Sequence, residues 1–106
     1  MDARFSNAEM SYVRRFVYVL IDPRDRRPHY VGETENPARR LEQHASANTG
    51  GATWKWCSEL RRLDLRPRMR IVEVVDADEC DVRRLSKVAE RRWIALLIRQ
   101  GAPLVN

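Results

Sequence analysis

The chain has 106 residues, 43% of them hydrophobic, which suits a single domain with one modest core. It has no apolar run of about 18 residues and no apolar stretch near its start, so we expect neither a membrane span nor a secretory signal. The net charge of +5 comes from 20 basic and 15 acidic residues, and all but two of the basic residues are arginine. Arginine binds phosphate bidentately, which is compatible with a polyanionic partner, but a GC-rich genome gives the same arginine bias.

The two cysteines, Cys57 and Cys80, lie far apart and lack the C-x-x-C spacing of a zinc site. Nothing in their positions requires a disulfide, although the sequence alone does not forbid one. Isolated cysteines are typical of reducing compartments, so we expect a cytoplasmic protein.

The first third of the chain predicts a β-hairpin. Residues 1–14 show no clear period and are expected to form a loose lead-in. The stretch RFVYVLI (15–21) is β-branched and aromatic, with apolar side chains on both faces, which predicts a central strand. A polar turn rich in Asp and Pro leads to a short second strand over 29–32. Antiparallel pairing of the two strands would bring Tyr18 and Tyr30 close together.

A helix is predicted directly after the hairpin. Asn36 can cap free backbone N–H groups, and Pro37 fits the first helical position. The helix is expected to run to residue 47 and to fray in the Asn-Thr-Gly-Gly run that follows. Arg40 and His44 are four residues apart, so they share one face of this helix.

The second half of the chain predicts a helix over 54–65, a strand over 69–75 and a long helix over about 78–99, which an acidic stretch begins. In the first helix Trp56, Leu60 and Leu63 are expected to face inward. The apolar positions of the long helix are Val82, Leu85, Val88, Ala89, Trp93, Leu96 and Leu97. The order β-β-α-α-β-α lacks a βαβ rhythm, so we predict an α+β fold in one domain over residues 1–106.

Several short motifs in this order resemble those of the GIY-YIG nuclease domain, over about residues 15–106. They are VYV (17–19), YVG (30–32), Arg40, His44, Glu90 and the terminal LVN. Each is weak alone, and together they are specific. The ERRWI segment followed by GAPLVN resembles small stand-alone bacterial and phage members.

The resemblance implies a small three-stranded antiparallel sheet flanked by helices, and an endonuclease that cuts DNA with one divalent metal ion, Mg²⁺, for which Mn²⁺ is expected to substitute. Carried over position by position, the implied catalytic residues are Tyr18, Tyr30, Arg40, His44, Glu90 and Asn106; Glu90 would also bind the metal, and Gly32 would be structural.

The chemistry of these side chains agrees with phosphodiester hydrolysis, which needs an activated water and neutralised charge. Glu90 offers an oxygen ligand for a hard cation, and Arg40 can clamp a phosphate. Tyr18 could accept the proton of the water if nearby positive charge lowered its pKa by about 3 units, or about 4 kcal/mol. His44 could pass that proton on, and Tyr30 could orient water or phosphate. Which tyrosine is the base stays open.

Two positions depart from the family pattern. Phe16 stands where the first motif has glycine. Glu33 follows the second motif, where a lysine or a small residue is more usual; its carboxylate could repel the phosphate or simply point to solvent. The tryptophans leave two alternatives as well, because Trp54, Trp56 and Trp93 could stack on bases or pack in the core.

Two other functions are weighed against cleavage. One is a nucleic-acid-binding module that no longer cuts, and the other is an interaction domain without nucleic acid. The chain has little beyond the nuclease core, so we expect weak or structure-based selectivity, or a partner protein that confers specificity. Preference for DNA over RNA, nicking against double-strand cutting, the biological pathway and the oligomeric state stay open.

Overall fold

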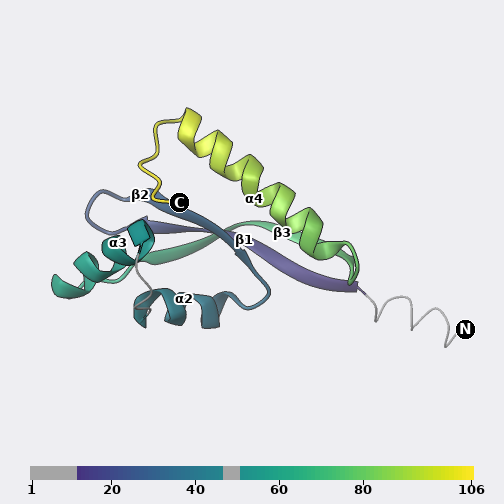
Figure 1. Cartoon of the computed structure of the whole chain (residues 1–106), viewed down its shortest axis with the longest axis horizontal. Coiled ribbons are helices and arrows are strands. Elements are labelled where there is room, and N and C mark those ends of the chain that lie inside the picture. Colours follow the sequence, from purple (N-terminus) through teal and green to yellow (C-terminus); the bar gives the residue numbers. More distant parts are fainter. Residues whose placement is uncertain (1–11, 47–50) are drawn as a thin grey trace, which may run out of the picture.

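The computed structural model describes residues 12–46 and 51–106 (Figure 1). Its elements are β1 (Tyr12–Asp22), β2 (Arg27–Thr34), α2 (Pro37–Ser46), α3 (Gly51–Arg62), β3 (Arg68–Asp78) and α4 (Val82–Arg99). This order is β-β-α-α-β-α and the fold is α+β, as predicted. The lead-in expected over 1–14 lies mostly outside the described residues, and from residue 12 onward it is already strand. Most of the frayed run after the first helix also lies outside them.

The sheet is antiparallel with the order β2-β1-β3, so β1 is the central strand, as predicted. In the β1–β2 hairpin Tyr18 lies opposite Gly32 and Leu20 opposite Tyr30. All three strands are longer than the apolar patterns indicated, because the backbone ladder continues where side chains are polar. Arg14 and Asp76, for example, lie opposite each other on β1 and β3 and form a bidentate ion pair. The distances are 2.7 Å from Arg14 Nε to Asp76 Oδ1 and 3.0 Å from Arg14 Nη2 to Asp76 Oδ2.

The sheet separates two hydrophobic clusters, with α4 on one side and α2 and α3 on the other (Figure 1). The α4 side consists of Val17, Val19, Val31, Ala89 and Leu97, and the other side of Tyr18, Leu20, Trp56, Cys57 and Leu60. Both cysteines are free. Among the described residues, no helix has the length and apolar character needed to cross a membrane.

The predicted inward face of α3 needs correction, and α4 buries only some of its apolar positions. Leu63 is 53% exposed, because α3 ends at Arg62 and the chain then turns through a positive φ at Asp64. In α4, Leu85, Val88 and Leu96 are also exposed. Among the described elements α4 packs mainly against the sheet, so its buried stripe is narrower than the arc of its apolar residues.

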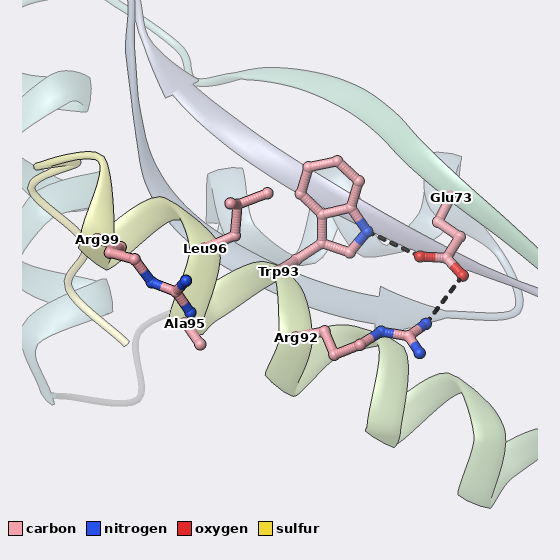
Figure 2. A pocket seen from close by; sticks show the side chains of 6 residues that line it. All are labelled: Glu73, Arg92, Trp93, Ala95, Leu96 and Arg99. Atoms are coloured by element: carbon pink, nitrogen blue, oxygen red, sulfur yellow. Dashed lines mark hydrogen bonds and ion pairs between the residues drawn. The ribbon is translucent and has the colours of Figure 1, made fainter.

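Two tryptophans have structural positions. The Trp93 indole N–H donates to Glu73 Oε1 at 2.8 Å and ties α4 to β3 (Figure 2). The Trp56 indole N–H donates to the buried Asp22 Oδ2 at 2.9 Å and ties α3 to β1. Both indole rings pack against the hydrophobic clusters.

Helix α4 begins later than expected, at Val82 rather than near residue 78.

The C-terminal segment pairs with the edge strand β2. The Val105 N–H donates to the His29 carbonyl at 2.7 Å. The Asn106 side chain accepts from the Val31 N–H at 2.9 Å and donates to the Val31 carbonyl at 2.7 Å. These bonds satisfy backbone groups that an edge strand would otherwise leave open.

Candidate active site

The β1–β2 hairpin places two phenols side by side on the α2 face of the sheet. The ring centroids of Tyr18 and Tyr30 are 6.2 Å apart. A Cβ atom at Gly32 would lie 2.5 Å from Tyr18 Oη and 2.9 Å from Tyr30 Cε2. Any side chain at this position would therefore displace the phenols, and this explains the structural role expected for Gly32.

Helix α2 brings His44 to the phenols. The helix begins as predicted: Asn36 Oδ1 accepts the Arg39 N–H at 3.0 Å. Two turns later His44 Nε2 lies 2.8 Å from Tyr18 Oη, and the imidazole packs edge-on against Tyr30 with ring centroids 5.0 Å apart. Leu41 packs into the Tyr18 cluster and so fixes the rotation of the helix.

The electrostatics of this contact indicate the charge state of its two groups. Burial and the neighbouring Tyr30 raise the pKa of Tyr18 above its ordinary value of 10, so the phenol stays protonated. Burial and the charge of Arg40 lower the pKa of His44 below 6.5, which favours the neutral ring. Both groups are therefore uncharged, and the Tyr18 hydroxyl donates to Nε2 when the neutral His44 ring carries its proton on Nδ1. The downward shift expected for Tyr18 is not produced by the protein groups alone, because burial outweighs the effect of Arg40.

Arg40 lies on α2 and Glu90 lies on α4, and these helices are on opposite sides of the sheet (Figure 1). Beyond the effect of burial, Glu90 raises the pKa of Tyr18 and Tyr30 and Arg40 lowers it, so both charges lie near both phenols. Arg40 forms no ion pair with any carboxylate in the described ranges. Its guanidinium is thus available to an anion near the phenols.

Glu90 has the properties of a carboxylate that could hold a divalent cation. Its side chain is 18% exposed, and its partner, the Lys87 ammonium, lies 3.8 Å away. Burial raises the pKa of Glu90, and the charge of Glu33 adds to this effect, so a cation beside it would relieve an unfavourable charge. One carboxylate with water and substrate suits Mg²⁺, which keeps several of its waters.

Comparison with known proteins agrees with this arrangement. A family model described as the GIY-YIG catalytic domain matches residues 14–96. The chain belongs to the GIY-YIG family. No curated protein and no solved structure matched the chain. The matched range contains Tyr18, Tyr30, Arg40, His44 and Glu90, and it excludes Asn106.

Asn106 has a different environment from the other candidate residues of this GIY-YIG domain. Both functional atoms of its amide bond to the backbone of Val31, which lies between Tyr30 and Gly32. The side chain therefore supports the strand that carries the phenols, and the structure places it against the backbone of β2.

Glu33 neither points to solvent nor faces the phenols. It alternates with Gly32 along β2, so it lies on the α4 face, and its side chain is 5% exposed. Arg15 binds both of its oxygens, at 2.7 and 3.2 Å, and the Ser86 hydroxyl donates to one of them at 2.7 Å. Lys87 lies 3.5 Å from Glu33 and so links it to Glu90. Sequence reasoning missed this cluster, although the alternation of side chains along β2 indicated that Glu33 lies on the face opposite to Gly32.

Other features of the GIY-YIG domain lie apart from these residues. A hollow of about 420 Å³ between α4 and β3 is lined by Glu73, Arg92, Trp93, Ala95, Leu96 and Arg99 (Figure 2). At the hairpin turn Asp22, Asp25 and His29 lie close enough together to suggest metal ligands. Asp22, however, already accepts hydrogen bonds from Arg24 and Trp56, so this group is a structural cluster.

Proposed function

We propose that this GIY-YIG domain is a divalent-metal-dependent DNA endonuclease that hydrolyses phosphodiester bonds. The observation that carries the proposal is the 2.8 Å contact between a protonated phenol, Tyr18, and a neutral imidazole, His44. The nearby Arg40 guanidinium has no carboxylate partner among the residues that the structure describes. A hydrogen-bonded pair of this kind can take up a proton at neutral pH.

Burial assigns different parts to the two phenols in this proposal. Tyr18 has no exposed surface, whereas Tyr30 is only half-buried, so an attacking water meets Tyr30 first. The water gives its proton to the Tyr30 hydroxyl as the Tyr30 proton passes to Tyr18 and the Tyr18 proton passes to His44 Nε2. The products of this relay are hydroxide and imidazolium, and neither tyrosine becomes a free phenolate.

The remaining side chains act on the phosphate. The hydroxide forms a bond to phosphorus, and the bond from phosphorus to the leaving ester oxygen breaks. Arg40 neutralises charge on the non-bridging oxygens. When bound at Glu90, a divalent cation would supply Lewis-acid stabilisation of phosphate charge.

The experiment that tests this function is digestion of supercoiled plasmid with Mg²⁺, Mn²⁺ or EDTA. We expect cleavage with either metal and none in EDTA. Glu90→Gln should reduce the rate by about 10²- to 10³-fold, the usual cost of removing one charge-stabilising group. Glu79→Gln is the matched control, because Glu79 is an exposed carboxylate outside the site. Equal rates for the two variants would contradict the role of Glu90.

A non-cleaving DNA-binding module is the second candidate, and the raised pKa of Tyr18 favours it, because the protein groups alone do not activate this phenol. In that case the wild-type protein would bind the plasmid and leave it intact with every metal.

A further inference from the structure

A second basic site lies at the end of the sheet formed by the hairpin turn and the start of β3. Arg26, Arg68 and Arg70 line a hollow of about 380 Å³ together with Ile21 and Pro23. Arg68 lies opposite Ile21 in the β1–β3 ladder. None of these residues belongs to the candidate active site, so the hollow is a separate feature.

The arginines of this hollow have no carboxylate partners within the described part of the chain. Many of the other arginines do, as in the pairs Arg14–Asp76, Arg15–Glu33, Arg24–Asp22, Arg66–Glu42, Arg84–Asp81 and Arg92–Glu73. The two acids of the nearby turn are also engaged: Asp22 is bound by Arg24 and Trp56, and Asp25 by His29. Three guanidiniums that share one hollow repel each other unless an anion lies between them.

Strand geometry gives these charges a fixed spacing. Arg68 and Arg70 alternate with Met69, which packs into the cluster on the α2 and α3 side, so both arginines face the α4 side of the sheet. Same-face positions on a strand are about 6.5 to 7 Å apart. A DNA strand carries one phosphate per about 3.4 Å of helix axis, so the backbone spacing of Arg68 and Arg70 corresponds to about two phosphate steps along the axis.

We propose that the hollow formed by Arg26, Arg68 and Arg70 binds phosphates of a DNA backbone and anchors the duplex away from the point of cleavage. The inference rests on the proposed function only in taking DNA as the polyanion. Guanidinium contacts to phosphate carry no sequence information, so the anchor contributes affinity that is independent of DNA sequence.

The test measures DNA binding in EDTA, where no cleavage occurs, as a function of salt. Each phosphate contact contributes about 0.9 to the slope of log affinity against log salt concentration. Arg68→Gln/Arg70→Gln should therefore make the slope shallower by about 2 and weaken binding equally for duplexes of different sequence. Arg68→Lys/Arg70→Lys keeps the charges and should restore most of the slope. Circular dichroism and thermal melting check that the variants are folded.

The matched control is Arg62→Gln/Arg83→Gln, which removes the same charge at exposed positions outside the hollow. An equal change of slope in the control would overturn the proposal, because net charge alone would then explain the effect. Inorganic pyrophosphate provides a second arm. If pyrophosphate bound in a way that depended on Arg68 and Arg70 while the DNA slope stayed unchanged, the site would be one for a small phosphate and the proposal would fail.

Loss of cleavage in the Glu90 experiment does not decide this question. A wild-type protein that binds DNA without cutting, with a slope that depends on Arg68 and Arg70, would refute the proposed activity and support the anchor. A protein that cuts plasmid, and whose salt slope does not depend on Arg68 and Arg70, would support the proposed activity and refute the anchor.

Discussion

At the scale of single residues, the protonation state of His44 is the main variable of the proposed relay. His44 can accept a proton from Tyr18 only while its Nε2 is unprotonated. Its pKa is lowered, first by burial and then by the charge of Arg40, so the neutral ring persists below the ordinary value of 6.5. Cleavage should therefore be constant around neutral pH and fall as the pH decreases through the lowered value.

Arg40→Gln provides a directional test of this explanation. Removing the guanidinium removes one cause of the shift, so the pKa of His44 should rise and the acidic limb of activity should move to higher pH. NMR titration of the two histidines measures this directly, and His29 serves as the internal control. A pKa of His44 that falls in the variant would contradict the electrostatic account.

At the scale of elements, the β1–β2 hairpin determines how closely the phenols approach. Gly32→Ala places a methyl group 2.5 Å from Tyr18 Oη and 2.6 Å from Cζ, and Tyr18 is fully buried with little room to move. We expect a loss of about 1 to 3 kcal/mol in the free energy of unfolding, measured by urea denaturation, together with reduced cleavage. Gly32→Ala combined with Tyr18→Phe should cost less than the sum of the two changes, because the nearest clashing atom is then absent.

The same hairpin shows what the sequence can and cannot predict. Its strands, its antiparallel pairing and the proximity of Tyr18 and Tyr30 follow from β-branched runs around a polar turn, and the start of α2 follows from the Asn-Pro cap. The environment of Glu33 does not follow in this way. Alternation assigns it to the opposite face from Gly32, but only tertiary packing supplies Arg15, Ser86 and Lys87 as partners.

Helix α4 illustrates a second limit of sequence reasoning. Its apolar residues occupy a wider arc than one sheet face can cover, so Leu85, Val88 and Leu96 are exposed, and the apolar pattern alone does not separate them from the buried positions. The position of Glu90 at the phenols depends on the docking of this helix through Trp93 and Glu73, which no local pattern encodes. Family resemblance supplied Glu90 as a candidate, and the packing explains how it reaches the other residues.

At the scale of the whole molecule, buried and paired carboxylates make stability depend on pH. Arg24 and Trp56 hold the pKa of Asp22 far below its ordinary value, and Arg15 and Ser86 lower that of Glu33 despite burial. Groups with lowered pKa stabilise the fold fully above their unfolded values, 3.8 for Asp and 4.5 for Glu, and this stabilisation is lost as the pH falls below them. Urea unfolding should therefore show a marked loss of stability between pH 5 and about pH 3.

Asp22→Asn is the variant that checks this assignment. The amide cannot titrate, so the variant should be less stable at neutral pH and lose less of its stability on acidification. Glu79→Gln, which alters an exposed carboxylate, should leave the pH dependence of unfolding unchanged. An unaltered pH dependence in Asp22→Asn would assign the acid sensitivity to other groups.

The pairing of Tyr18 with Gly32 has a consequence for how such a domain can vary. Successive residues of a strand point to opposite faces of the sheet. Inserting one residue before Tyr30 would therefore move Tyr30 and Gly32 to the α4 face and turn Val31 and Glu33 toward His44. Inserting two residues would preserve the faces. We therefore expect β2 to tolerate insertions of an even number of residues better than insertions of an odd number. In a library of insertion variants, the folded and active proteins should be mainly those with even insertions.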